Sequence, residues 1–284
     1  MISQKSFQNQ KPTLFLVPTP IGNLNDMTPR ALQILEDVDI IYAEDTRVTK
    51  NLLSHFNIQN EIRSYHLFNE NIVANEIIKI LENQKNVAIV SDAGLPLISD
   101  PGYLVCKLAI ANGFNVVSLP GANAALTALV ASGISPERFY FYGFLNHKKS
   151  QKKKELKALV DFKDTLIFYE APHRIKETLL IMYEVFGDRD VVIARELTKM
   201  YEEYIRGTLK AVINYDFQEK GEFVIIVGGA KISSEVARLN SLSIDEHYNY
   251  YLNIGYNTKD AMKQVASDRN ISKSEVYKEL INKK

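Results

Sequence analysis

Short runs of consecutive apolar residues recur along the chain, with segments of helical character between them. An unbroken run of four or five apolar residues is typical of a strand that is buried on both faces. Strands that alternate with helices predict an α/β architecture with a largely parallel sheet. The predicted strands are Leu14–Val17, Ile40–Ala43, Val87–Val90, Val116–Leu119, Phe139–Tyr142, Thr165–Tyr169, Val191–Ala194 and Phe223–Val227.

Residues that favour helix ends lie between these runs. Thr28-Pro29 combines an N-cap with a first-turn proline, and Asp100-Pro101 and Ala171-Pro172 have a similar form. Glycine is common just after the last turn of a helix, where it adopts a left-handed conformation. The glycines expected to end helices are Gly113, Gly133 and Gly187.

The order of these elements predicts three folded parts. Four predicted strands precede Pro120 and four follow it, so we expect an N-terminal lobe over 12–120 and a second α/β lobe over 121–232, facing each other across a cleft. Residues 1–11 contain no apolar stretch and are expected to form a disordered tail. Residues 233–284 show helical signals alone, and they predict either a helix-turn-helix module or a helical cap packed on the second lobe. Helices are expected to start there at Ser243 with Glu246, at Thr258, and at Ser272 with Glu275. The last of these helices is expected to bury Val276, Leu280 and Ile281.

Composition limits the possible partners and compartments. Of 284 residues, 46% are hydrophobic, and 34 basic residues balance 34 acidic ones. A nucleic-acid surface must therefore be a local patch. Cys106 is the one cysteine, which excludes an internal disulfide and favours a reducing, cytoplasmic compartment. No apolar run approaches the ~18 residues that a membrane-spanning helix needs, so no membrane partner is expected.

Three loops rich in proline and glycine follow predicted strands. They are Pro18–Leu24, Ser91–Gly102 and Pro120–Ala124. In parallel sheets, ligands bind beyond the carboxyl ends of the strands, although each loop alone is also explained as a tight turn. The sequence has no G-x-G-x-x-G after the first strand, no phosphate-binding G-x-x-x-x-G-K-[ST], no G-x-S-x-G and no paired histidine spacing that indicates a metal. These absences disfavour a nicotinamide enzyme, an NTPase, a serine hydrolase and a metal centre.

Several motifs together resemble the tetrapyrrole methylase family. They are Thr19–Leu24, Ala43–Arg47, Ser91–Gly102, Pro120–Ala125, Tyr169–Ile175 and Ala194–Lys199. The resemblance implies two α/β lobes that hold S-adenosylmethionine in a cleft and release S-adenosylhomocysteine. Similarity is strongest to the branch that methylates the ribose 2′-oxygen of a cytidine in the decoding region of 16S ribosomal RNA, within the small ribosomal subunit. It also implies a homodimer.

The resemblance assigns cofactor contacts at matching positions. In the first lobe these are Pro20, Ile21, Gly94, Leu95, Pro96, Ile98, Ala122 and Asn123, and in the second lobe Tyr169, Glu170, Leu197 and Glu222. No metal is implied.

Transfer of a methyl group to a hydroxyl requires alignment of the reacting atoms and a base that accepts the hydroxyl proton. Glu44, Asp45, Asp92 and Asp100 follow predicted strands on the cleft side, and Glu44 and Asp100 are the favoured bases. The competing interpretation is that Asp100 and Asp45 are helix N-caps. Arg47 and Arg195 are expected to hold a phosphate or a neighbouring carboxylate.

A lysine-rich segment follows the first strand of the second lobe. Lysine clusters bind phosphates by counterion release, although such a run is also common on a solvated helix face. Tyr140, Tyr142 and Phe144 are candidates for stacking on an extruded base. The lysines assigned to RNA are Lys148, Lys149, Lys152, Lys153, Lys154 and Lys157.

Two alternatives to the RNA methyltransferase remain open from the sequence. One is a methylase of a small tetrapyrrole precursor, although such a substrate needs neither the lysines nor the terminal helices. The other is a non-catalytic RNA-binding protein on the same fold, which an intact cofactor cleft would distinguish.

Overall fold

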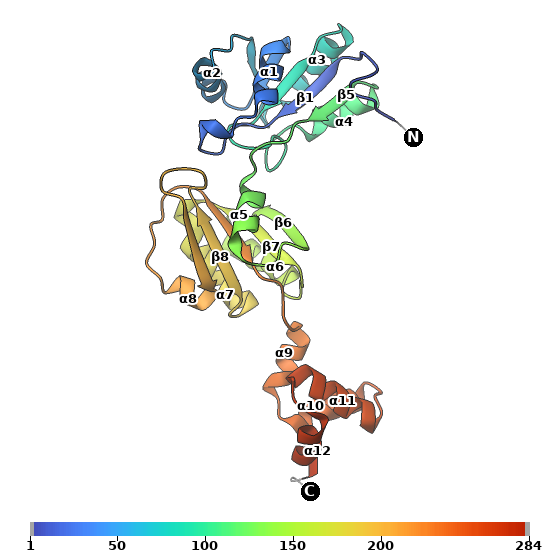
Figure 1. The fold of residues 1–284 in the computed structure, drawn as a ribbon. Coiled ribbons are helices and arrows are strands. Elements are labelled where there is room, and N and C mark those ends of the chain that lie inside the picture. Colours follow the sequence, from blue (N-terminus) through green and yellow to red (C-terminus); the bar gives the residue numbers. More distant parts are fainter. Residues whose placement is uncertain (1–2, 282–284) are drawn as a thin grey trace.

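The computed structural model describes residues 3–281 of the chain. Figure 1 shows three parts arranged along one long axis: an N-terminal lobe, a second lobe and a group of helices at the C-terminal end. Each lobe is built on a five-stranded sheet. The strands are β1 (Thr13–Val17), β2 (Ile40–Ala43), β3 (Ile62–Ser64), β4 (Val87–Val90), β5 (Asn115–Ser118), β6 (Phe139–Phe144), β7 (Thr165–Glu170), β8 (Asp190–Arg195), β9 (Glu203–Thr208) and β10 (Phe223–Val227).

Helices connect these strands and form the whole C-terminal part. The α-helices are α1 (Pro29–Asp37), α2 (Thr46–His55), α3 (Glu70–Glu82), α4 (Tyr103–Ala111), α5 (Ala124–Ser132), α6 (Lys149–Ala158), α7 (Ile175–Phe186), α8 (Leu209–Ile213), α9 (Ser234–Ser241), α10 (Ile244–Asn253), α11 (Thr258–Arg269) and α12 (Lys273–Ile281). Two 3₁₀ turns, η1 (Leu24–Asp26) and η2 (Pro172–Arg174), precede helices α1 and α7.

The first sheet is parallel throughout, with the strand order β3-β2-β4-β1-β5. Alternate residues of β1 enter two different cores: Leu14 and Leu16 pack with α3 and α4, whereas Phe15 and Val17 pack with α1 and α2. Because helices cover both faces, all five residues of β1 are buried. The unbroken apolar runs of the sequence have this physical cause.

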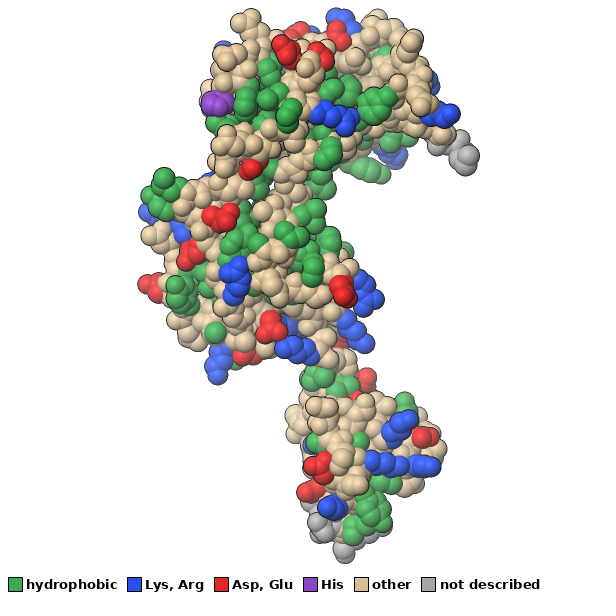
Figure 2. All heavy atoms as spheres, viewed as in Figure 1, with side chains coloured by type: hydrophobic (Ala, Val, Ile, Leu, Met, Phe, Trp, Pro, Cys, Tyr) green, Lys and Arg blue, Asp and Glu red, His purple; other side chains and the backbone are tan. Residues whose placement is uncertain are grey.

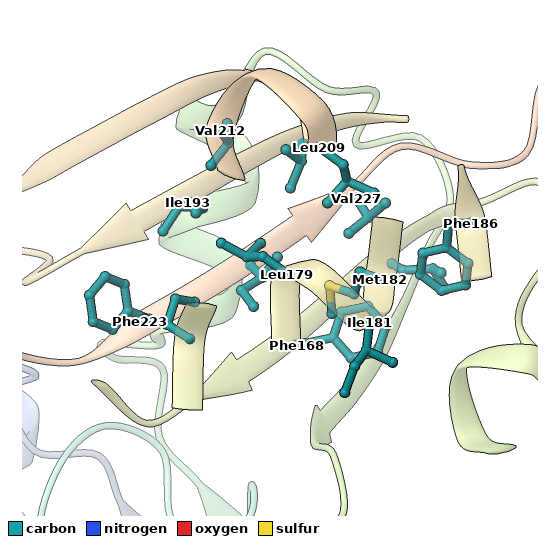
Figure 3. Packing of buried hydrophobic residues seen from close by; sticks show 14 of the residues in the cluster. Phe168, Leu179, Ile181, Met182, Phe186, Ile193, Leu209, Val212, Phe223 and Val227 are labelled. Atoms are coloured by element: carbon teal, nitrogen blue, oxygen red, sulfur yellow. The ribbon is translucent and has the colours of Figure 1, made fainter. Parts of the chain in front are cut away.

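The second sheet corrects the expectation of largely parallel pairing. Its order is β6-β7-β10-β8-β9, and within this sheet the β6–β7 pair alone is parallel among the described strands. An apolar run reports burial on both faces of a strand but not the direction of its neighbours. Helices α6, α7 and α8 cover one face, where Phe168, Leu179 and Ile193 pack together (Figure 3). Helix α5 covers the other face through its small residues Ala125 and Ala128.

All eight predicted strands are present, and two further strands were not predicted. Strand β3 has three residues and is only half-buried, so it lacks an apolar run. Strand β9 is an edge strand with alternating polar residues. Neither strand therefore has the continuous apolar run that predicts a strand buried on two faces.

Most helix-end predictions are confirmed. Thr28 caps α1 by accepting from the Ala31 amide at 3.2 Å, and Ser243 with Glu246 forms a complete capping box. Ser272 and Glu275 exchange the same pair of bonds. Two predictions are wrong, because α4 begins after Gly102 instead of Asp100, and Asn257 caps α11 instead of Thr258.

The C-terminal helices form a bundle with its own core. Leu239, Tyr251, Val265 and Val276 are buried against one another, whereas Ile281 is exposed, contrary to its expected inward position. Figure 1 shows this bundle beyond the second lobe. The structure therefore favours a separate helical module over a cap packed on the second sheet.

The described part of the N-terminal segment differs from the disordered tail that was expected. The side-chain amide of Gln4 binds the Val116 backbone through both its nitrogen and its oxygen, and Asn9 exchanges hydrogen bonds with Asn115. Residues 4–9 therefore lie along edge strand β5, while residues 1 and 2 lie outside the described part of the chain.

Candidate active site

A cavity of about 440 Å³ lies between the two lobes. Figure 2 shows the molecule narrowing where the lobes meet. From the first lobe, the cavity is lined by residues that follow the carboxyl ends of β1, β2, β4 and β5. From the second lobe, it is lined by residues at the ends of β7 and β8 and the start of β10, which share one edge because β10 runs antiparallel to both. The lining residues are Ile21, Glu44, Asp92, Ala93, Gly94, Leu95, Ile98, Ser99, Asp100, Asn123, Ala124, Phe144, Tyr169, Glu170, Ala171, Pro172, Leu197, Glu222, Phe223 and Val224.

The loop after β4 is fixed to the loop after β1. Thr19 and Gly94 exchange backbone hydrogen bonds of 2.9 and 3.0 Å, and the Ser91 hydroxyl donates to the Gly94 carbonyl at 3.0 Å. Gly94 has φ +83°, and a Cβ there would lie 3.2 Å from Ile21 Cγ2. Leu97 and Ser99 also have positive φ values of 71° and 69°, which are strained for residues other than glycine. The loop is therefore held in one unusual shape along the cavity.

The second lobe contributes an aromatic and apolar wall. The Tyr169 hydroxyl accepts a hydrogen bond from the Ala125 amide at 3.2 Å, which fixes the ring beside the first turn of α5. The Phe144 ring lies 5.5 Å from the Tyr169 ring and is 53% exposed. Leu197 is buried in a core that includes Ile21 of the first lobe. The two lobes therefore share apolar contacts beside the cavity.

Three carboxyl groups lie on the first-lobe side of the cavity. Burial, together with the nearby charges of Glu44 and Asp92, raises the pKa of Asp100 to about 6. Burial and the Asp92 charge also raise the pKa of Glu44. Asp100 does not cap α4, whose N-cap is Gly102, so its carboxyl group remains available at the cavity. Such raised values suit groups that exchange protons near neutral pH.

Asp45 and the two predicted arginines have structural partners. Asp45 caps α2 and binds Arg47 through both carboxylate oxygens, which lowers the pKa of Asp45 to about 2. Arg195 binds Glu203 at 3.0 Å. Of the two expected uses of these arginines, the structure shows the pairing with a carboxylate.

Most residues predicted to bind a cofactor line this cavity, and three do not. Pro96 lines a small adjoining cavity together with Glu44, Tyr65 and Asp100. The Ala122 carbonyl faces Gly94, and Pro20 is half-buried in the loop after β1. The predicted residues that line the cavity, the favoured bases included, are Glu44, Asp100, Ile21, Gly94, Leu95, Ile98, Asn123, Tyr169, Glu170, Leu197 and Glu222.

Sequence reasoning missed part of the second-lobe wall. Phe223 and Val224 line the cavity because antiparallel pairing places the start of β10 beside the end of β7. The direction of a buried strand cannot be read from its apolar run. Ala171 and Pro172, in contrast, belong to a motif that the sequence did single out.

Glu170 is the centre of a buried charged network, which corrects the role expected for Lys152. The side chains of Glu170 and Lys152 are 0% exposed, and their charged atoms lie 3.8 Å apart. Lys152 Nζ donates to Thr178 Oγ1 at 2.7 Å, and Thr178 donates to Glu170. Arg174 Nε lies 3.0 Å from Glu170 Oε1. Lys152 therefore faces the core of the second lobe and cannot contact phosphate in this structure.

The other lysines of this segment lie on or near the surface. Lys153 is paired with Glu184 and is half-buried. The exposed lysines are Lys148, Lys149, Lys154 and Lys157. Among the aromatic candidates, Phe144 lines the cavity, whereas Tyr140 and Tyr142 pack on Phe162 and Phe168 of the second lobe.

Within residues 3–281, no helix is long and apolar enough to cross a membrane. In the same part of the chain, no group of three or more His, Cys, Asp or Glu side chains is arranged to hold a metal ion.

The fold and the sequence both resemble those of known methylases. The family described as Tetrapyrrole (Corrin/Porphyrin) Methylases matches residues 13–213. The solved structure of a cobalamin biosynthetic enzyme, cobalt precorrin-4 methyltransferase, superposes with a TM-score of 0.57 at 17% identity, covering 76% of this chain and 94% of that one. At this identity, the likeness supports the fold alone.

Two curated relatives are much more similar. Ribosomal RNA small subunit methyltransferase I of Bacillus subtilis (strain 168) is 52% identical over 269 residues, which covers 93% of this chain and 92% of the relative. The protein with the same name from Halalkalibacterium halodurans is 47% identical over 283 residues, with 98% of each chain covered. The chain therefore belongs to the tetrapyrrole methylase family and, within it, to the group of ribosomal RNA small subunit methyltransferase I proteins.

Replacement of Lys152 by Met should destabilise the protein strongly. The change leaves the buried Glu170 carboxylate without one of its cations, and breaking a buried pair in this way costs about 3 kcal/mol. Lys154→Met on the same helix is the matched control, because Lys154 is exposed, and its effect should stay within about 0.5 kcal/mol. Urea unfolding measures both. Equal stability of the two variants would contradict the burial of Lys152.

Replacement of Asp100 by Asn should stabilise the protein in a pH-dependent way. Because folding raises the Asp100 pKa to about 6 from 3.8, the folded state binds this proton more tightly than the unfolded state. The wild type therefore loses stability as the pH rises from about 4 through 6, and Asn does not. The variant should gain about 1–2 kcal/mol above pH 6, after allowance for partial exposure, and none near pH 4.

Asp45→Asn provides a contrasting control, since the Asp45 pKa is lowered to about 2. Because the folded state favours the ionised form of Asp45, this carboxylate stabilises the protein above pH 4, and the stabilisation is lost as the pH falls toward 2. The Asp45→Asn variant should therefore be less stable than the wild type at neutral pH. Urea unfolding at a series of pH values checks both variants. A loss of stability at neutral pH in Asp100→Asn would contradict the first assignment, and a gain in Asp45→Asn would contradict the second.

Proposed function

We propose that this chain transfers a methyl group from S-adenosylmethionine to the ribose 2′-oxygen of a cytidine in the decoding region of 16S ribosomal RNA, within the small ribosomal subunit. The observation that carries the proposal is the cavity between the lobes, with carboxyl groups of raised pKa on one side and an apolar wall on the other. The name shared by the relatives supports the substrate class. The ribose atom and the cytidine come from the family resemblance.

The residues around the cavity fit S-adenosylmethionine. Its adenine is a flat apolar ring, which suits the wall that includes Leu197 and Val224. Its cationic groups suit the negative side of the cavity formed by Glu44, Asp92 and Asp100. When bound, the cofactor supplies a methyl group that is already activated for displacement. S-adenosylhomocysteine is the product that remains.

The chain's own contribution to the chemistry is to align the acceptor and to take its proton. A ribose hydroxyl is a weak nucleophile until a base accepts that proton. Asp100 is the first choice for this base, because its pKa of about 6 lets it be ionised at neutral pH yet basic enough to accept a proton. Glu44 lies on the same side of the cavity and is the second choice.

The exposed lysines of α6 and its preceding turn are proposed to contact RNA phosphates. They follow β6, whose last residue, Phe144, lines the cavity. Phosphate contacts position RNA without selecting a base. A homodimer and a cytoplasmic location are further parts of the proposal, and sedimentation velocity tests the dimer.

The activity itself is tested with small subunits purified from a strain that lacks the enzyme. Labelled methyl should move from S-adenosylmethionine to the RNA, and nuclease digestion with mass spectrometry should locate it on a cytidine ribose. Asp100→Asn should lower kcat about 10²- to 10⁴-fold if Asp100 is the base. Calorimetry should show a much smaller loss of cofactor affinity, because Glu44 and Asp92 remain on the negative side of the cavity. Label on a base, or on no RNA, would refute the ribose assignment.

Replacement of four exposed lysines by Ala should weaken RNA binding and reduce its salt dependence. The slope of log K against log salt should fall by roughly 0.7 for each phosphate that the variant no longer neutralises. Cofactor affinity should not change. The four residues are Lys148, Lys149, Lys154 and Lys157.

A matched control variant removes the same number of exposed lysines elsewhere and should leave the slope unchanged. An equal effect of both variants would assign the RNA contact to another surface. The control residues are Lys79, Lys85, Lys107 and Lys210.

A further inference from the structure

An exposed aromatic residue lies beyond the acidic side of the cavity. Phe68 is 98% exposed, and its neighbours Leu67 and Ile72 are 68% and 76% exposed. Large apolar side chains exposed within five residues of the chain are candidates for a contact surface, since contiguous exposed apolar surface usually marks one. No role in the cofactor pocket accounts for them, because none of the three lines the cavity.

The turn that carries Phe68 belongs to the same edge of the sheet as the carboxyl groups. It follows β3, which pairs in parallel with β2, so their carboxyl ends meet at one edge. The Tyr65 amide donates to the Ala43 carbonyl at 2.8 Å, and Ala43 immediately precedes Glu44. Tyr65 also lines the small adjoining cavity together with Glu44 and Asp100. Phe68 is therefore three residues from a side chain that borders the acidic site.

Hydrogen bonds fix this turn in place. The Asn69 side chain accepts from the His66 amide at 2.8 Å and donates to the Ser64 carbonyl at 3.2 Å. Glu70 accepts from the Tyr65 hydroxyl and from the Gly102 amide, each at 3.1 Å. The second bond ties the turn to the loop after β4 that lines the cavity. An aromatic ring on a fixed turn can bind a flat partner with little loss of conformational entropy.

His66 gives a second indication of a missing partner. Its Nδ1 atom is buried and has no hydrogen-bond partner among the described residues. The ring lies within electrostatic range of the Glu44 carboxyl group. The His66 and Phe68 rings lie 6.0 Å apart in an edge-to-face arrangement. The turn thus carries a polar ring within electrostatic range of Glu44 and an apolar ring exposed to solvent.

We infer that Phe68 is the stacking platform for the nucleobase of the acceptor nucleotide, which leaves the RNA stack so that its ribose hydroxyl can reach Asp100 or Glu44. This inference rests on the proposed function. A base has an apolar face that a single exposed ring can cover, and stacking of this kind tolerates any base. A second copy of the chain is the less favoured occupant, because a stable interface buries about 800 Å² on each partner, much more than one ring and two aliphatic side chains supply.

The test compares Phe68→Ala with Phe68→Trp in methyl transfer to unmodified small subunits. Loss of base stacking should reduce kcat/KM for RNA by about ten- to a hundredfold in Phe68→Ala, and the larger ring of Phe68→Trp should retain activity within about threefold. Calorimetry should give unchanged affinity for S-adenosylmethionine in both. Rescue by Trp separates stacking from a general role in folding.

Phe7→Ala is the matched control. Phe7 is 74% exposed on the segment beside β5, at the opposite edge of the same sheet from β3, so its loss should leave RNA methylation unchanged. Wild-type activity of Phe68→Ala would overturn the inference. A Phe68→Ala variant that sediments as a monomer where the wild type is a dimer, with activity reduced to match, would also overturn it. That result would assign the Phe68 ring to a contact between two copies of the chain. If the wild type itself methylates no RNA, the proposed function fails independently of Phe68.

Discussion

The parallel pairing of β2, β4 and β1 is the constraint on which the candidate site depends. Parallel strands bring their carboxyl ends to one edge, so the residues that follow them meet there although they are far apart in the sequence. Glu44 follows β2, Asp92 and Asp100 follow β4, and Ile21 follows β1. Burial, together with the charges of neighbouring carboxylates, then raises the pKa of Glu44 and Asp100. The chemistry of the site is thus a consequence of strand direction.

The second lobe meets this edge by a different route. Its sheet is mostly antiparallel, and the ends of β7 and β8 lie beside the start of β10. Glu170 stabilises that edge from within, because its buried carboxylate binds Arg174, Thr178 and Lys152 behind the cavity wall. Buried charges of this kind cost desolvation energy unless each has partners, as they do here. The network also joins α6, which carries the exposed lysines, to the strand end that lines the cavity.

Strain is concentrated in the loops between the two edges. Leu97, Ser99, Glu196 and Thr198 all have positive φ values, and they lie in the loops that follow β4 and β8. Such conformations persist only where surrounding contacts determine them. The Thr19–Gly94 hydrogen bonds and the ion pairs of Lys199 with Glu196 and Glu222 are such contacts. The backbone around the cavity is therefore held in one shape by its surroundings.

The sequence by itself determined where the buried strands lie, the capping boxes of the last helices and the loops that line the cavity. These features follow from local signals: an apolar run records burial on both faces, and a cap records a hydrogen bond within four residues. The motifs at Ser91–Gly102 and Tyr169–Ile175 likewise identified most of the cavity residues. Tertiary structure alone decided what depends on direction and distance. It placed Phe223 in the cavity through antiparallel pairing and freed Asp100 from the N-cap of α4. It also turned Lys152 inward to Glu170, although Lys154 on the same helix is exposed. Each of these outcomes depends on contacts between residues remote in the chain, which no local pattern records.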